Sequence, residues 1–252
     1  DRLTALACRV SSRPHWVRGF HTWMLGLASQ WMGVSGLHAN SVAPVLVSRE
    51  QGRRKSSFCR ALMPDVLARY YTDNLKLTSQ GQAERMLAEM GLLNMDEFDK
   101  YAESKMPLLK NLMQMSVLNI RKAYQQNFRQ LPRIASFIGT SNRFDLLTDP
   151  TGSRRFLCIE VKHDIDCTGI EHDRIFAQLK AELIAGRRSW FTKSEEEELQ
   201  RHNEAFYRVS LAEEAVRSLF RAPLPAEKSI DLTAADIFDE LQKTHPAPVS
   251  YT

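Results

Sequence analysis

A short apolar run, followed by a polar loop and then by a helix, constrains this chain more than any other feature. Residues 44–47 read Pro-Val-Leu-Val, which is the length and composition of a buried strand. The polar stretch 48–57 comes next and contains Gly52, and the apolar positions Phe58 and Leu62 after it indicate a helix. A strand, a loop and a helix in this order are typical of a loop whose backbone N–H groups hold phosphates.

Within this loop, Lys55 and Ser56 have the side chains that phosphate binding requires. The ammonium group of Lys55 is expected to reach the β- and γ-phosphates of a nucleotide, and the hydroxyl of Ser56 is expected to ligate Mg²⁺. The pattern G-x-x-x-x-G-K-[ST] requires glycine where this chain has Arg49 and Arg54, and an arginine Cβ disfavours the backbone conformations that glycine supplies. A Lys-Ser pair after a polar turn also begins ordinary helices, so the loop alone leaves both interpretations open. The predicted nucleotide-binding residues are Gln51, Gly52, Arg53, Arg54, Lys55, Ser56 and Ser57.

Two further apolar runs end in polar residues that suit the same chemistry. The run 92–95 leads into Asp96 and Glu97. Asp96 is predicted to hold Mg²⁺ through water, and Glu97 to orient or deprotonate the attacking water. The run 134–139 leads into Asn142, whose amide is predicted to contact the γ-phosphate or the attacking water. Each group alone also fits an ordinary turn, and their order behind the loop favours the functional interpretation.

A pair of arginines, Arg154 and Arg155, stands in a tight turn just before the apolar run 156–161. A guanidinium group stabilises the charge on transferring phosphoryl oxygens, and it can do so from a neighbouring subunit. We slightly favour Arg154 as this arginine finger. A pair of ordinary surface arginines is the alternative.

Alternating helical and strand patterns predict an α/β fold with a parallel sheet covered on both faces. The aromatic residues Trp16, Phe20, Trp23 and Trp31 have helical spacing, which indicates a helix packed on the core or, less favoured, a lid over a bound base. We expect a helical lead-in over 1–40, a core over 41–170, a helical region packed on the core over 171–222, and the beginning of a small C-terminal domain over 223–252, for which truncation is an open alternative.

The middle of the chain has a strongly uneven charge distribution. Residues 104–144 contain no Asp or Glu, while Lys and Arg recur throughout. Cations pair with phosphates and aromatic rings stack on unpaired bases, so this block predicts a nucleic-acid surface. The alternative is a basic amphipathic surface whose aromatic rings belong to the core, with Arg121 or Arg133 serving the nucleotide of an adjacent subunit. The predicted nucleic-acid-binding residues are Arg121, Lys122, Tyr124, Arg129 and Arg133.

Composition excludes several classes of protein. With 43% hydrophobic and 25% charged residues among 252, the chain has the balance of an ordinary globular protein. The cysteines are scattered without zinc spacing, which is typical of reduced thiols in a cytoplasmic protein. Because no segment approaches the roughly 18 uninterrupted apolar residues of a membrane span, we expect no membrane partner.

Taken together, these motifs resemble the virulence-associated E family of prophages and integrative elements, whose members are similar to superfamily 3 helicases. The resemblance covers roughly residues 1–220 and depends on the motifs at 51–52, 55–56, 94–98, 139–142 and 151–156. It implies a RecA-like, AAA+-type αβα P-loop NTPase core with a helical N-terminal lead-in and a helical C-terminal region. It also implies ATP and Mg²⁺ as cofactors, single-stranded or duplex DNA as partner, and a homo-oligomeric ring such as a hexamer. In similar ring helicases, the segment between the acidic motif and the Asn142 strand lines the pore.

Two functions therefore compete. The first is an ATP-dependent, helicase-like or DNA-remodelling ATPase that acts in the replication of a mobile genetic element. The second is a catalytically impaired nucleotide- or DNA-binding module with the same fold, in which Arg49 and Arg54 have closed or reshaped the loop. Turnover of ATP distinguishes the two.

Overall fold

The structure is a computed structural model. It describes residues 1–36, 38–75, 77, 80–121, 128–149, 152–209, 211–221, 227 and 229–244. The chain divides into two compact units, Asp1–Tyr207 and Arg208–Thr252, which are described separately below. The finer division at residues 40, 170 and 222 stays a prediction.

The helices and strands of the first unit alternate along much of the chain. Its α-helices are α1 (Arg2–Cys8), α2 (Pro14–Trp31), α3 (Lys55–Ala61), α4 (Gln80–Glu89), α5 (Met106–Gln114), α6 (His172–Ile184) and α7 (Lys193–His202). Its 3₁₀ helices are η1 (Asp65–Tyr70), η2 (Phe98–Lys100), η3 (Glu103–Lys105), η4 (Ser153–Arg155) and η5 (Asn203–Phe206). Its strands are β1 (Ala43–Val47), β2 (Tyr71–Thr72), β3 (Leu92–Met95), β4 (Val117–Arg121), β5 (Phe128–Pro132), β6 (Ser136–Ser141) and β7 (Phe156–Glu160).

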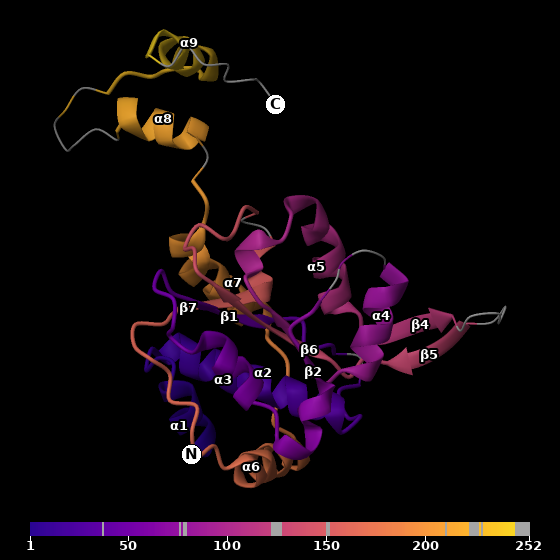
Figure 1. Cartoon of the computed structure of the whole chain (residues 1–252). Coiled ribbons are helices and arrows are strands. Elements are labelled where there is room, and N and C mark those ends of the chain that lie inside the picture. The colour runs from indigo at the N-terminus through magenta and orange to yellow at the C-terminus, as the bar shows by residue number, and fades with distance from the viewer. Residues whose placement is uncertain are drawn as a thin grey trace. The chain divides into compact units, whose positions relative to one another are not determined.

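The central sheet has the strand order β2-β3-β6-β1-β7, and each pair of neighbouring strands in it is parallel (Figure 1). Strand β6 lies between β1 and β3, with Val47 beside Ser141 and Met95 beside Gly139. The carboxyl ends of β1, β3 and β6 therefore meet at one edge of the sheet. The predicted parallel sheet is confirmed.

Helices cover both faces of this sheet. Successive side chains of a strand point to opposite faces, so Leu46 joins the hydrophobic cluster that contains α1, α2, α3 and α6, while Val45 and Val47 join the cluster that contains α4 and α5. Figure 1 shows α2 and α3 on one side of the strands and α5 on the other. The result is an αβα arrangement.

The aromatic stripe near the start of the chain forms the inner face of α2. Trp16, Phe20 and Trp23 are all fully buried. The indole N–H of Trp23 donates to the carbonyl of Phe137 in β6 at 3.1 Å, which attaches the helix directly to the sheet. This arrangement favours the core helix over the lid.

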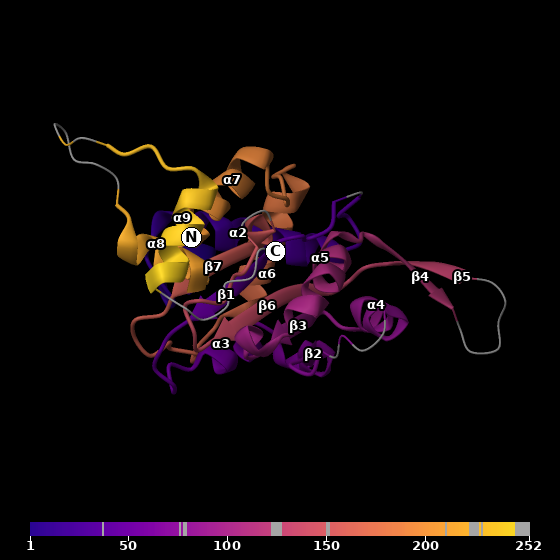
Figure 2. The ribbon, with the colours of Figure 1, turned by 90° about the horizontal axis from the view of Figure 1, so that it is seen from above.

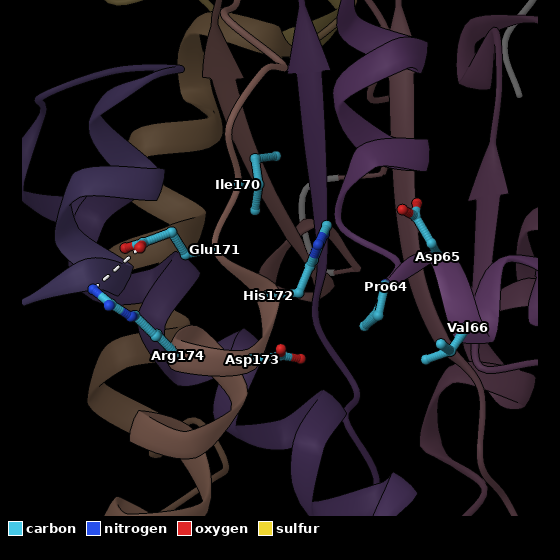
Figure 3. A pocket seen from close by; sticks show the side chains of 8 residues that line it. All are labelled: Pro64, Asp65, Val66, Ile170, Glu171, His172, Asp173 and Arg174. Carbon is cyan, nitrogen blue, oxygen red and sulfur yellow. Dashed lines mark ion pairs between the residues drawn. The ribbon is translucent and has the colours of Figure 1, made fainter.

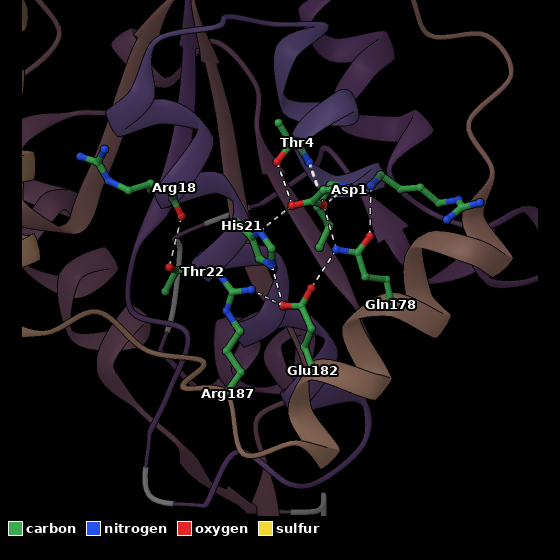
Figure 4. Close-up of polar contacts among 10 residues, drawn as sticks. Asp1, Thr4, Arg18, His21, Thr22, Gln178, Glu182 and Arg187 are labelled. Atoms are coloured by element: carbon green, nitrogen blue, oxygen red, sulfur yellow. Dashed lines mark hydrogen bonds and ion pairs between the residues drawn. The ribbon is translucent and has the colours of Figure 1, made fainter.

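Polar contacts join α1, α2 and α6 on the outer side of this layer (Figure 4). The imidazole of His21 is buried and lies 2.7 Å from a carboxylate oxygen of Glu182. The amide of Gln178 donates to Glu182 and to Asp1, each at 2.8 Å, and the guanidinium of Arg187 donates to Glu182 at the same distance. Burial of the polar groups is thus compensated by hydrogen bonds.

A two-stranded hairpin, β4 and β5, was not predicted from the sequence. Its strands pair antiparallel, from Val117 beside Pro132 to Arg121 beside Phe128, and do not belong to the central sheet. Figures 1 and 2 show it extending beyond α4. Polar and charged residues interrupt the apolar runs of both strands, which hides them from a periodicity argument.

The second unit contains the helices α8 (Leu211–Leu219) and α9 (Ala234–Thr244). Thr233 caps α9, because it precedes the helix and its hydroxyl accepts from the backbone N–H of Asp236 at 3.3 Å. The Asp236 carboxylate accepts from the backbone N–H of Thr233 at 2.8 Å, which completes a reciprocal cap. Among the helices of the described residues in both units, none is long and apolar enough to cross a bilayer.

Candidate functional site

The loop between β1 and α3 contains two residues in the left-handed backbone region. Gly52 has φ 84°, and Arg54 has φ 58°, in the left-handed region that glycine normally occupies. This conformation costs an arginine roughly 1 kcal/mol relative to glycine. Arg54 thus adopts the conformation of the missing glycine, and the Arg49 guanidinium lies outside the loop, 5.3 Å from the centre of the Phe144 ring.

The segment after β7 holds this loop in place. Arg53 donates to the carboxylate of Asp164 at 3.0 Å and also contacts Glu50. The backbone N–H of Ile165 donates to the carbonyl of Arg53 at 3.3 Å. Of the predicted nucleotide-binding residues, Arg53 therefore has a structural role in the loop.

Lys55, the first residue of α3, connects the ends of two strands. Its ammonium group donates to the hydroxyl of Ser48, after β1, and to the amide oxygen of Asn142, after β6, each at 2.8 Å. The side chain is buried, and burial lowers the pKa of the ammonium while Asp96 and Asp99 raise it. The structure thus joins two residues that the sequence singled out separately.

Ser56 and Asp96, the predicted metal ligands, are also in contact. The Ser56 hydroxyl donates to Oδ1 of Asp96 at 2.7 Å. The same oxygen accepts from the Thr140 hydroxyl at 2.5 Å, and the Thr140 oxygen accepts from the backbone N–H of Glu97 at 3.3 Å. Thr140 is therefore a member of the site that the sequence argument missed. The sequence feature that could have revealed Thr140 is a hydroxyl side chain near the end of a largely apolar strand.

The carboxylate of Glu97 forms an ion pair with a lysine of the same turn. Glu97 has φ 50°, a left-handed conformation, and accepts from the ammonium of Lys100 at 2.6 Å. Asp99, in the same turn, accepts from the Ser141 hydroxyl at 2.7 Å and from the backbone N–H of Asn142 at 3.4 Å. Asp99 thereby fixes the position from which Asn142 reaches Lys55, a second role that the sequence argument missed.

These groups offer a cation, an amide and carboxylate oxygens along one edge of a parallel sheet. Hydroxyl and carboxylate oxygens are the ligands that Mg²⁺ prefers, and a buried ammonium attracts phosphate oxygens. The arrangement can therefore hold a metal-bound polyphosphate.

Arg154 and Arg155 lie at the opposite edge. Phe156, which follows them, pairs with Ala43 at the start of β1, whereas the loop follows Val47 at its end, roughly 13 Å further along the strand. Within one chain, neither arginine reaches the loop network.

Their local contacts differ. Arg154 forms an ion pair with Glu196 at 3.5 Å. The Nε of Arg155 is buried and has no hydrogen-bond partner among the described residues. Burial and the neighbouring Arg154 lower the pKa of Arg155.

The predicted nucleic-acid residues separate into different environments. Arg129 lies exposed on β5. Arg121 ends β4, and its side chain, like Lys122 and Tyr124, lies outside the described part of the chain.

The assignment of Arg133 to this surface is corrected by the structure, because the residue is only 2% exposed. Its guanidinium donates to backbone carbonyls and lies 5.0 Å from the centre of the Phe137 ring. Burial lowers its pKa to about 9, so the group stays charged at neutral pH. The accepting carbonyls are those of Asn40, Leu112, Met113, Met115 and Ala135.

Comparison with known protein families gives a match over most of the chain. The virulence-associated protein E-like domain matches residues 9–208. The chain belongs to this family. The resemblance inferred from the loop, the acidic motif and the arginine turn is thus confirmed.

Solved structures similar to this virulence-associated protein E-like chain are two apo A-form structures of the C-terminal region of NrS-1. One, of residues 305–718, is 16% identical with a TM-score of 0.45, over 81% of this chain and 43% of that chain. The other is 15% identical with a TM-score of 0.45, over 88% of this chain and 51% of that chain. The chain therefore spans about half the length of these solved structures. Among curated proteins, none matches it.

Proposed function

We propose that this chain is an ATP-hydrolysing, helicase-like or DNA-remodelling ATPase that acts in the replication of a mobile genetic element. The observation that carries the proposal is the network at the sheet edge, in which Lys55 contacts Asn142 and Ser56 contacts Asp96. The fold in this proposal is a RecA-like, AAA+-type P-loop core. It is supported by the parallel αβα sheet, in which the loop follows β1 and β6 separates β1 from β3.

Each residue of the network then has a definite part in hydrolysis. Lys55 holds the β- and γ-phosphates, and Asn142 contacts the γ-phosphate or the attacking water. The oxygen donors of Ser56 and Asp96 fit Mg²⁺, which when bound neutralises charge that develops on the phosphates. Glu97 orients or deprotonates the attacking water, and to do so its carboxylate must leave Lys100.

The position of the arginine turn supports an oligomeric enzyme. Since Arg154 and Arg155 lie at the opposite edge of the sheet from Lys55, they can meet a nucleotide only on a neighbouring subunit. A homo-oligomeric ring, such as a hexamer, is the arrangement in which every site receives such an arginine. DNA, single-stranded or duplex, would contact the β4–β5 hairpin. Arg129 of this hairpin is exposed and belongs to the block 104–144, which contains no Asp or Glu.

ATP hydrolysis by the oligomer, with and without single-stranded DNA, tests the proposal. Lys55→Ala should abolish ATP binding, whereas Glu97→Gln should bind ATP and not hydrolyse it. Glu89→Gln is the matched control, because Glu89 is an exposed acid at the end of α4 outside the network. A wild-type oligomer without DNA-stimulated hydrolysis would refute the proposal.

A second candidate is a nucleotide- or DNA-binding module that does not hydrolyse ATP. Two observations favour this candidate. The ion pair with Lys100 engages the carboxylate of Glu97, the proposed general base. The left-handed conformation of Arg54 strains the loop. Replacing Arg49 and Arg54 with glycine discriminates the two candidates. A large gain in ATP affinity would show that the natural loop is impaired, and unchanged affinity would remove the main argument for this alternative.

A further inference from the structure

A buried asparagine holds the arginine turn, residues 152–155, from outside the turn. This residue is Asn203, at the junction of α7 and η5, and it is only 1% exposed. A buried amide costs free energy unless its polar atoms are hydrogen-bonded within the protein. The partners of Asn203 therefore show which part of the chain it fixes.

The amide of Asn203 is bonded to the backbone on both sides of the two arginines. Its Nδ2 donates to the carbonyl of Ser153, immediately before the arginines, and to the carbonyl of Phe156, immediately after them, each at 2.8 Å. Its Oδ1 accepts from the backbone N–H of Cys158 at 3.4 Å. One side chain thus ties both ends of the turn together.

These bonds do more than cover the edge of the sheet. Strand β7 is the last in the strand order, so its outer backbone groups need partners other than a described strand. The bonds to Phe156 and Cys158 serve that edge. The Ser153 carbonyl lies before the strand, in η4, so the bond to it fixes the turn rather than the sheet.

The end of η5 adds a second attachment and is itself anchored. The hydroxyl of Tyr207 is hydrogen-bonded to the hydroxyl of Ser153. The backbone N–H of Leu147 donates to the carbonyl of Phe206 at 3.0 Å, and the Phe206 ring stacks on Phe144, with 5.7 Å between the ring centres. The support of the arginine turn is therefore attached to the segment that follows β6.

The guanidinium of Arg154 is held less firmly than the backbone of its turn. Its ion pair with Glu196 of α7 is 3.5 Å long and partly exposed. Exposed ion pairs contribute little stability, so this pair can open when a phosphate is offered. A rigid backbone that carries a releasable cation suits an arginine that acts on another molecule.

Arg174 shows the ordinary case of an exposed arginine. Figure 3 shows its ion pair with Glu171, at 3.2 Å, beside a pocket between η1 and α6. The backbone of Arg174 belongs to the regular helix α6, whose own hydrogen bonds hold it. Backbone bonds from a buried side chain of another element are thus not a general requirement of an ion-paired arginine.

We propose that Asn203 is a positioning residue, which fixes the arginine turn so that its guanidinium reaches a nucleotide bound by a neighbouring subunit. This inference rests on the proposed function, because it requires ATP hydrolysis by an oligomer. It predicts an effect on the arginine that a subunit supplies to its neighbour and no effect on the phosphate loop of the same subunit.

Asn203→Asp tests this role, because a carboxylate has the same shape and an acceptor but donates neither bond to the carbonyls. A displacement of about 1 Å costs roughly 100-fold in rate, so hydrolysis should fall by about 100-fold while ATP affinity stays within about twofold of wild type. Asn40→Asp is the matched control. Asn40 is also buried and donates two bonds, to Trp23 and Ser136, away from the turn. Equal losses of hydrolysis in the two variants would overturn the inference.

Mixed oligomers separate the phosphate loop from the arginine turn. Asn203→Asp subunits keep an intact loop, so Lys55→Ala subunits, whose turn is intact, should restore part of the hydrolysis. Arg154→Ala subunits should not, because neither subunit in that mixture then presents an arginine. The opposite pattern would place the defect in the loop of the Asn203→Asp subunit and overturn the inference. Loss of rescue in both mixtures would also overturn it, since it indicates general structural damage.

Tyr207→Phe is a milder variant, which keeps the test decisive if Asn203→Asp does not fold. It removes the hydroxyl that is bonded to Ser153, and it should show the same pattern of rescue after a smaller loss of hydrolysis, about fivefold. Wild-type hydrolysis with the wrong pattern of rescue would refute the role of Asn203 alone. A wild-type oligomer that does not hydrolyse ATP would refute the proposed function and this inference together.

Discussion

Replacing Arg133 with methionine should destabilise the protein without weakening its contact with DNA. The guanidinium donates to four carbonyls within 3.2 Å, two of which belong to the last turn of α5, where backbone carbonyls have no partner in the helix. Methionine fills a similar volume but donates no hydrogen bond. The substitution therefore leaves buried carbonyls unsatisfied in the layer between α5, the loop at Asn40 and β6.

The expected magnitude follows from these four bonds. The Ala135 carbonyl keeps a donor, the side-chain amide of Gln30 at 2.9 Å, so three carbonyls are left without the guanidinium. An unsatisfied buried acceptor costs about 1 kcal/mol at the low end of the usual range, so three cost about 3 kcal/mol. Relief of the cost of burying the guanidinium charge offsets part of this amount. A net loss of about 2 kcal/mol remains, which is a substantial part of the roughly 5–15 kcal/mol that stabilises a typical domain.

Urea unfolding measures this loss directly. With a slope of about 2.5 kcal/mol per molar urea, the midpoint should fall by about 0.8 M. The control is Arg129→Met, an exposed arginine of the hairpin, which should change the unfolding free energy by less than about 0.5 kcal/mol.

DNA binding should show the opposite pattern. If Arg129 contacts a phosphate, Arg129→Met lowers the slope of log affinity against log salt concentration by about 0.7 to 0.9, whereas Arg133→Met leaves it unchanged. The reasoning is refuted if Arg133→Met unfolds within about 1 kcal/mol of wild type and also lowers this slope.

Three further predictions follow from the contacts of other residues. Thr140→Val removes the hydroxyl that joins Asp96 to the turn at Glu97, so it should lower ATP hydrolysis about tenfold or more, while Thr140→Ser restores it; equal rates in both variants would exclude a role for the hydroxyl. Arg154→Ala should abolish hydrolysis alone but regain part of it when mixed with Lys55→Ala subunits, because a mixed oligomer contains sites with an intact loop and an intact neighbouring arginine; mixed oligomers that stay inactive would argue against an arginine acting between subunits. The hydrogen bonds with Arg188 are the main cause that lowers the pKa of Glu195 to about 2, so its carboxylate adds stability that is present above the ordinary value of 4.5 and is lost as the pH falls toward 2. In urea unfolding measured against pH, Glu195→Gln should reduce this loss of stability in acid, and an unchanged acid profile would contradict the role of Glu195.

Local patterns in the sequence were sufficient where a residue's neighbours along the chain decide its structure. The runs at 44–47 and 92–95 are strands because continuous apolar residues of this length are buried on both faces of a parallel sheet. The helix at α2 follows from aromatic residues repeated at helical spacing. The sequence did not reveal the hairpin β4–β5, because polar residues interrupt the apolar pattern of both strands. Each of these strands is held by hydrogen bonds to the other, which a pattern within one strand does not show.

The candidate site divides in the same way. The sequence by itself determined which residue types were available: Lys55, Ser56, Asp96 and Asn142 follow strands or begin a helix, and the ends of parallel strands meet at one edge. Only the tertiary structure decided their partners. In the fold, Thr140 donates a hydrogen bond to Asp96, and Glu97 accepts one from Lys100. Arg154 lies at the edge of the sheet opposite to the loop.

Arg54 and Arg133 show the physical reason most clearly. In the sequence, each is one arginine in a basic segment, and burial and backbone dihedrals are not properties of a residue type. Arg133 is enclosed by carbonyl oxygens because α5 packs against the connection between β5 and β6. Arg54 has a left-handed conformation in a loop that is hydrogen-bonded to the segment after β7. Contacts between residues far apart along the chain decide both, so only the folded structure determines what these two arginines do.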